Sequence, residues 1–403
     1  MRPVPGQAVI RGACRAAIGV LAVVAWSSPP LTAQGAPPGW QAVTRQFDAY
    51  VEADQVVGAS LAFVSNGRIT ARHHVGMADR AAGQAVDDST LWHWASNTKT
   101  LTAVSVLQLR DQGRLTLEDP ATRWVPELRQ VHDPYGSIDH VTVRMLLSHS
   151  SGFQNPTWPY GSGAAWEPFE PTAWSQLVAM MPWQELRFAP GSRYGYSNPA
   201  YIYLARIIES LTGDPWAVYV QQNIWTPLGM PRSYVNGTPP YLAAHRSNRY
   251  HVQRDSIGKV DVRPGGRDFD PGVTIPNGGW NAPVDDLATW IGFLTGRLAG
   301  RTGYGALLSR ATLAEMWTPV VPVHSDGSVV ESMGLGFFLY DLNGHRLVGH
   351  TGDQGGFRSF MVFDPATGQG VIGVVNTSND ADPQASGRGF TALFHSALQL
   401  LAH

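Results

Sequence analysis

The hydrophobic pattern at the start of the chain predicts one helix followed by a pair of strands. Apolar residues recur on one face between residues 40 and 51, with the period of an amphipathic helix. An apolar run at 59–64 and a strand-like segment at 69–75 then flank Asn66-Gly67, a dipeptide typical of tight hairpin turns. This part of the chain is therefore expected to begin an antiparallel sheet.

Strand patterns return only near the other end of the chain. Asn343-Gly344 marks a second hairpin, and a helical pattern with an apolar face covers residues 390–401. The strands predicted here are 335–341, 345–350, 357–363 and 371–376. Between the two sets of strands, residues 98–112 predict a helix, and the chain up to about residue 270 has the pattern of helices and loops.

These positions predict an α+β fold. The two ends of the chain are expected to form one antiparallel sheet flanked by the N- and C-terminal helices, because that packing covers the apolar faces of all three elements. Residues 36–95 and 275–403 are assigned to this α/β sheet lobe, and residues 96–274 to an inserted, mainly helical lobe. The cleft between the lobes is then the expected active site.

The first 35 residues have the pattern of a secretory signal peptide. Arg2, Arg11 and Arg15 precede or adjoin an apolar stretch at 16–26, which is too short to cross a bilayer. An uncleaved membrane anchor is the alternative interpretation. The signal predicts a secreted or periplasmic protein without stable membrane insertion after cleavage.

Composition narrows the chemistry further. The only cysteine, Cys14, lies in the predicted signal, so disulfides, thiol catalysis and Cys-ligated metals are excluded from the mature chain. Cleavage would also remove three arginines and no acid, which changes the formal charge from −2 to −5 and argues against nucleic-acid binding. The histidines at 73, 74, 149 and 251 lack partners at metal-ligand spacing, so no metal or other cofactor is expected.

Lysine is rare in this chain, and its position points to chemistry. Of 29 lysines and arginines, only Lys99 and Lys259 are lysines. Because arginine cannot lose its proton in a protein, Lys99 is expected to serve as an amine that can. Ser96 precedes it by three residues at the start of the 98–112 helix, which makes the two side chains neighbours. Burial would lower the lysine pKa from about 10.4, so that the amine could take the proton of a serine nucleophile.

The Ser-x-x-Lys spacing by itself is a weak signal of a serine nucleophile. Ser256 and Lys259 repeat it, but Gly258 and the flanking residues predict a solvated loop there. For Ser96 and Lys99, the alternative interpretation is an N-cap serine with a surface lysine.

Tyr196 and Asn198 precede a second helical pattern. Asn198 is expected at the N-cap and Pro199 at the first helical position. In a serine site, the Tyr196 phenol could relay a proton, and the Asn198 amide could hold both substrate and Lys99. The alternative is that these residues only cap a helix.

His350, Thr351 and Gly352 end a predicted strand, whose edge can hold an extended acyl group. The next residue, Asp353, has a backbone N–H that could pair with that of Ser96 as an oxyanion hole. Gly352 would let a substrate approach closely. Alone, such a sequence is more typical of a turn.

Together these segments resemble the Ser-x-x-Lys, Tyr-x-Asn and Lys/His-Thr-Gly motifs of the serine beta-lactamase and penicillin-binding-protein family, in its class C-like branch. The resemblance runs from about residue 42 to the C-terminus and includes 146–153, 188–191 and 278–279. It implies an α/β lobe and a helical lobe with the serine between them. It also implies acylation and deacylation at Ser96 without a metal.

Two residues depart from the beta-lactamases of this branch. Those enzymes usually carry lysine at the position of His350, whereas many esterase and peptidase relatives have histidine. Asp353 replaces a small residue, and although only its backbone N–H is needed for an oxyanion hole, its charge would repel an anionic substrate. Both departures favour neutral esters or amides over beta-lactams.

The sequence therefore predicts a secreted serine hydrolase that acts on a small ester, amide or beta-lactam. Ser96 is the expected nucleophile and Lys99 and Tyr196 handle its proton, while substrate and oxyanion are bound by Asn198, His350, Thr351, Gly352 and Asp353. A beta-lactamase proper or a D-amino peptidase is the alternative of the same class. A weakly catalytic penicillin-binding sensor is the alternative of another class.

Overall fold

The computed structural model describes residues 35–153, 171–298, 304–325 and 329–403. The segment Gly35–His403 forms one compact unit, so the division into two lobes stays a prediction. The predicted signal peptide lies outside the described residues apart from Gly35, and export likewise stays a prediction. Within the described ranges, no helix combines the length and the apolar character needed to cross a bilayer.

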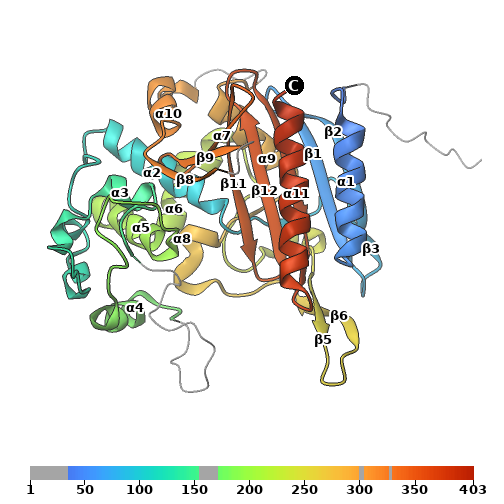
Figure 1. Ribbon diagram of the computed structural model, residues 1–403, viewed down its shortest axis with the longest axis horizontal. Helices are drawn as coiled ribbons and strands as arrows, with labels where there is room; N and C mark the ends of the chain where they lie inside the picture. Colours follow the sequence, from blue (N-terminus) through green and yellow to red (C-terminus); the bar gives the residue numbers. More distant parts are fainter. Residues whose placement is uncertain (1–34, 154–170, 299–303, 326–328) are drawn as a thin grey trace, which may run out of the picture. The chain divides into compact units, whose positions relative to one another are not determined.

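An antiparallel sheet joins the two ends of the chain, which confirms the predicted fold class (Figure 1). Its strands are β1 (Gly58–Ser65), β2 (Arg68–Asp79), β3 (Gln84–Ala85), β8 (Val321–Ser325), β9 (Val330–Met333), β10 (Phe338–Leu342), β11 (His345–Gln354), β12 (Phe357–Asp364) and β13 (Gln369–Val375). Among the described residues their order is β3-β2-β1-β13-β12-β11-β10-β9-β8. The ends meet where β1 pairs with β13, with Ala59 opposite Val375.

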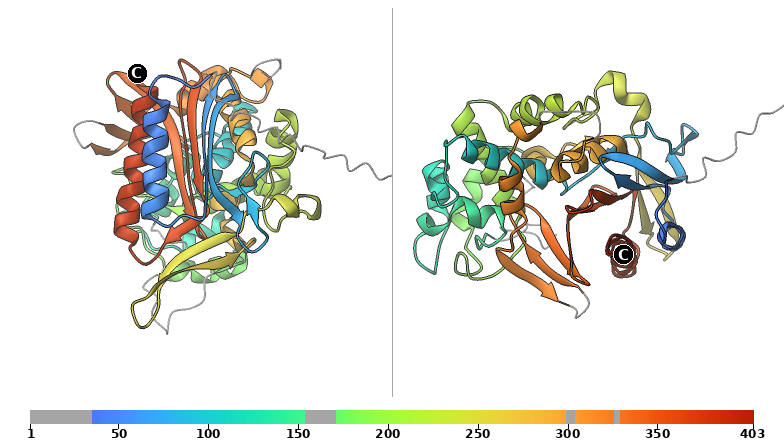
Figure 2. Two further views of the ribbon diagram at one scale, coloured as in Figure 1. Left: turned by 90° about the vertical axis from the view of Figure 1, so that its right-hand side faces the viewer. Right: turned by 90° about the horizontal axis from the view of Figure 1, so that it is seen from above.

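Helices cover both faces of this sheet. On one face, α1 (Trp40–Ala53) and α11 (Pro383–Leu401) lie side by side, as Figures 1 and 2 show. There Phe47, Phe360 and Leu398 belong to one buried apolar cluster. On the other face, α9 (Val284–Thr295) packs against β1 and β13. The apolar periodicity of the terminal segments thus predicted their packing correctly.

The remaining α-helices and strands range from two to 15 residues in length. The other helices are α2 (Thr98–Asp111), α3 (Val143–Leu147), α4 (Trp174–Met180), α5 (Asn198–Thr212), α6 (Trp216–Val220), α7 (Thr226–Leu228), α8 (Ile275–Gly278) and α10 (Arg310–Met316). The other strands are β4 (Trp92–His93), β5 (Arg249–Arg254), β6 (Val260–Gly266), β7 (Asn281–Ala282) and β14 (Thr377–Asn379).

A hairpin lies in the segment that was predicted to be helical and loop-rich. Strands β5 and β6 pair antiparallel, and β5 also pairs in parallel with β14. The exposed turn between β5 and β6 carries Ser256 and Lys259, which agrees with the solvated loop predicted there. The sequence did not predict β5 and β6 because their side chains are largely polar. The strand that extends their sheet, β14, also lies more than 120 residues from β5 along the chain.

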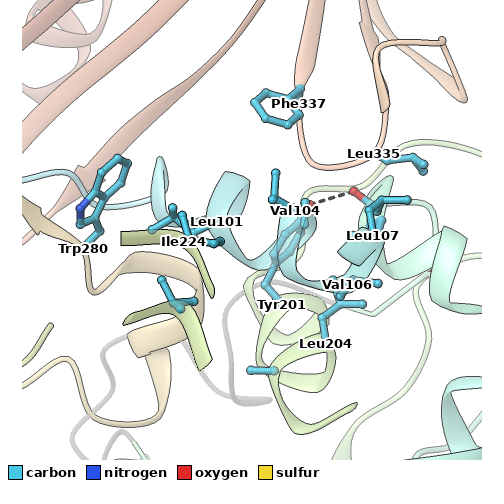
Figure 3. Packing of buried hydrophobic residues seen from close by; sticks show 14 of the residues in the cluster. Leu101, Val104, Val106, Leu107, Tyr201, Leu204, Ile224, Trp280, Leu335 and Phe337 are labelled. Carbon is cyan, nitrogen blue, oxygen red and sulfur yellow. Dashed lines mark hydrogen bonds between the residues drawn. The ribbon is translucent and has the colours of Figure 1, made fainter. Parts of the chain in front are cut away.

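Helix α2 lies at the centre of the apolar core. Every residue from Thr98 to Leu109 is buried. Its Thr102 and Ser105 hydroxyls donate to the carbonyl oxygens of Pro276 and Leu101, so polar side chains are tolerated there. Figure 3 shows α2 side chains among residues of α5 and of the loop before β10 in the same cluster. The helix that follows Ser96 is therefore held on all sides.

The loop before β10 approaches α2 so closely that it requires glycine. Gly336 has a φ of +84°, and a Cβ built there would lie 2.2 Å from the Ala103 Cβ. The substitution Gly336→Ala should therefore lower the free energy of unfolding by roughly 3 kcal/mol, from left-handed strain and overpacking together. Gly344→Ala is the matched control, because φ is +81° but no atom lies within 4 Å, and it should cost about 1 kcal/mol. Equal losses in chemical denaturation would contradict this packing.

Candidate active site

The chain presents Ser96 on a sharp turn before α2. Ala95 adopts a φ of +48°, which is unfavourable for a residue with a Cβ and often marks a functional site. Ser96 itself is half-buried, so its hydroxyl can meet a substrate. Gly352 of β11 packs against this turn, since a Cβ there would lie 2.4 Å from the Trp94 carbonyl oxygen. Gly352 was predicted to let a substrate approach closely. In the structure, the close approach at Gly352 is between β11 and the turn before α2.

Lys99 lies directly beside Ser96 and is fully buried. Its Nζ is 3.0 Å from Ser96 Oγ, 2.8 Å from Asn198 Oδ1 and 2.8 Å from the Asn277 carbonyl oxygen. The two carbonyl-type oxygens can only accept hydrogen bonds, whereas the Ser96 hydroxyl can also donate one. An uncharged amine has two N–H groups and one lone pair, and it satisfies all three contacts when Ser96 donates to it.

Burial lowers the pKa of Lys99 well below its ordinary value of 10.5, and no other cause contributes. The three hydrogen-bonding partners of the amine are neutral groups, so none of them supplies the opposite charge that would keep it protonated. This arrangement can accept the proton of Ser96.

Asn198 lies one position further into its helix than predicted. Ser197 is the N-cap of α5, because its Oγ accepts the Ala200 N–H at 3.3 Å. The Asn198 side chain is therefore directed to other partners, and its Oδ1 accepts from both Lys99 and the Asn277 amide. Asn277 was not among the residues predicted from the sequence. Its only signal was its place before Gly278-Gly279, a pair noted for the family resemblance alone.

Tyr196 lies against the nucleophile as a neutral phenol. Burial raises its pKa above the ordinary value of 10.0, and a hydrogen bond with Ser96 acts in the opposite direction. Its ring lies over His149, with centroids 4.4 Å apart. His149 is fully buried and its Nδ1 accepts the Ser197 N–H at 3.1 Å, so it supports the segment that carries Tyr196.

The end of β11 forms the opposite wall. His350 is buried, and burial is the main cause that lowers its pKa to about 3. A cleft of about 440 Å³ brings together the predicted site residues other than the buried Lys99, and adds residues of β10, β12 and α11. The lining residues are Ser96, Tyr196, Asn198, Phe338, His350, Thr351, Gly352, Asp353, Arg358, Gly387, Phe390 and Thr391.

Comparison with known proteins assigns the family. A sequence profile described as "Beta-lactamase" matches residues 43–395, and the chain therefore belongs to the beta-lactamase family, a family of serine hydrolases. Esterase EstB of Burkholderia gladioli is 36% identical over 259 residues, which cover 58% of this chain and 64% of that protein. The chain spans 64% of the length of the curated relatives it matches.

Solved structures agree on the fold. A D-stereospecific amidohydrolase from Streptomyces sp. is 25% identical with a TM-score of 0.67, and the match covers 88% of this chain and 98% of that one. A class C beta-lactamase is 19% identical with a TM-score of 0.69, over 90% of this chain and 96% of that one. The family resemblance inferred from the three motifs is thus confirmed.

The lowered pKa of Lys99 should make stability depend on pH in one direction. The unfolded chain keeps this amine charged up to about pH 10.4, whereas the folded chain releases its proton at a lower pH. Between the two pKa values the unfolded state binds more protons, so folding becomes more favourable as the pH rises. Chemical denaturation should show wild type gaining stability relative to Lys99→Met between pH 7 and pH 10.

The matched control is Lys259→Met, because the Lys259 amine lies on an exposed turn in the folded chain as well. This variant should show no such trend relative to wild type. A stability difference between wild type and Lys99→Met that stays constant over the same pH range would mean that the folded protein holds the Lys99 amine charged.

Proposed function

We propose that this protein hydrolyses neutral ester or amide bonds through an acyl-enzyme on Ser96. The observation that carries the proposal is the contact of 3.0 Å between Ser96 Oγ and a fully buried lysine amine whose pKa is lowered. A serine hydroxyl becomes an effective nucleophile when an adjacent base removes its proton. The esterase and amidohydrolase among the similar proteins support this reaction class.

Each proton and bond has a place in the proposed reaction. Ser96 Oγ attacks the carbonyl carbon while its proton passes to Lys99 Nζ, and the backbone N–H groups of Ser96 and Asp353 stabilise the oxyanion. The bond to the leaving group then breaks, and the leaving group takes the proton from Lys99 by way of the Tyr196 hydroxyl. Water then attacks the resulting ester and gives its proton to Lys99 by way of the Tyr196 hydroxyl. Lys99 returns this proton to Ser96 Oγ as the acyl bond breaks, so the acid is released and Ser96 is restored.

The walls of the cleft do not favour a substrate with a carboxylate. With a pKa of about 3, His350 is uncharged at neutral pH, so it offers no cation to a substrate carboxylate. Thr351 and Asn198 supply neutral hydrogen-bonding groups, and Phe338 and Phe390 supply apolar surface. These features support neutral esters and amides over beta-lactams, which carry a carboxylate.

Replacing the nucleophile tests the assignment. Ser96→Ala should reduce turnover of a p-nitrophenyl ester to the uncatalysed rate while leaving the thermal unfolding transition in place, because the variant only removes the attacking oxygen. Ser256→Ala, which alters the second Ser-x-x-Lys sequence on an exposed turn, should keep full activity. Activity that persists in Ser96→Ala would refute the proposal.

Substrate charge distinguishes this proposal from a beta-lactamase and from a penicillin-binding sensor. We expect kcat/KM for a short neutral ester to exceed that for a penicillin or cephalosporin by roughly tenfold or more, equivalent to about 1.4 kcal/mol. Mass spectrometry after exposure to each compound should find no lasting adduct with the ester. A stable penicillin adduct without ester turnover would instead identify a sensor.

A further inference from the structure

A charged pair stands at the edge of the cleft. Asp353 of β11 and Arg358 of β12 lie directly opposite each other, and the Arg358 Nε donates to Asp353 Oδ2 at 2.8 Å. Both residues line the cleft, but the Asp353 side chain is 60% exposed and that of Arg358 only 12%. The pair therefore presents the Asp353 carboxylate, and not the Arg358 guanidinium, to a molecule that enters the cleft.

The arginine is held behind the aspartate by the face of the sheet that α11 covers. Arg358 Nη1 also donates to the Ser386 hydroxyl on α11. Ser386 is fully buried and in turn donates to the carboxylate of Asp54, which follows α1. A guanidinium engaged on two sides cannot swing into the cleft to meet an anion without breaking these hydrogen bonds.

Little else in the cleft lining offsets this carboxylate. Of the lining residues that the structure describes, those other than Asp353 and Arg358 are uncharged, His350 included. The Lys99 amine is fully buried and does not line the cleft. An entering substrate therefore meets a negative charge at the same residue whose backbone N–H is proposed for the oxyanion hole.

We propose that Asp353 is a specificity-determining residue that selects substrates with a positively charged group over substrates with a carboxylate. The selected compounds are esters or amides with an ammonium-type cation on the part that reaches toward Thr351 and α11. A charge pair in a partly desolvated cleft is stronger than one in water, and a like charge at the same place is repelled. This inference rests on the proposed hydrolase function and adds a substrate class to it.

Three matched esters test the selection. They are p-nitrophenyl esters whose acyl chains have equal length and end in a trimethylammonium, a tert-butyl or a carboxylate group, so that shape stays nearly constant while charge changes. A second series places the same end groups on the leaving group. In at least one series, kcat/KM should fall from cation to neutral to anion, with a cation-to-anion ratio of roughly tenfold or more at low salt.

Two substitutions identify the source of the selection. Asp353→Asn keeps the size of the side chain and an oxygen for Arg358 but removes the charge. The ratio of kcat/KM for the cationic ester to that for the anionic ester should therefore fall to about one or below. This expectation holds whatever the absolute rates of the variant are. Asp341→Asn is the matched control, because Asp341 and Arg346 form the same kind of pair across β10 and β11, at 2.7 Å, without lining the cleft. This control should keep the wild-type ratio.

The outcomes separate this inference from the proposed function. If the neutral ester is hydrolysed but the wild-type ratio is near one in both series, or if the ratio survives Asp353→Asn, the inference is wrong and the hydrolase proposal stands. If no ester is hydrolysed, arylboronic acids carrying either a trimethylammonium or a carboxylate group provide the same comparison through binding measured by calorimetry. Equal affinities for the two boronic acids would overturn the inference.

Discussion

The site depends on keeping one lysine amine uncharged beside one serine hydroxyl. Charge is expensive to bury, and the structure places Lys99 where no water reaches it and its hydrogen-bonding partners are neutral. Three separate elements enforce this: α2 carries the lysine, α5 brings Asn198, and α8 brings the carbonyl of Asn277. If any one of these three elements moved away, the amine would meet water or lose a hydrogen-bonding partner. Either change would alter the pKa of Lys99.

The same desolvation acts on the groups around the lysine. Burial raises the pKa of Tyr196 and lowers those of His149 and His350, so all three side chains are neutral near pH 7. An uncharged phenol beside Ser96 can donate and pass on a proton, but it is not itself a base. This supports the proposed division in which Lys99 is the base and Tyr196 is the relay.

Close backbone contacts bring these groups together. Gly352 lets β11 approach the Trp94 carbonyl, and Ala95 adopts a left-handed conformation in the turn that carries Ser96. Ser96 and Asp353 thereby line the same cleft. Asp353 thus contributes a backbone amide, which a small residue at this position would also supply. Its charged side chain is what a small residue would lack.

The sequence by itself determined the elements whose signals are local. Asn66-Gly67 and Asn343-Gly344 mark hairpins because asparagine and glycine tolerate positive φ, and both pairs have it here. Alternating and helical periods predicted the sheet and its terminal helices. Helical spacing predicted Ser96 and Lys99 as neighbours, and the family resemblance added Tyr196 and Asn198 to them. Only the tertiary structure decided what lies around them. Asn277, the hairpin β5–β6 and the Asp353–Arg358 pair depend on contacts between distant segments, and the pKa of a buried amine depends on everything that excludes water from it.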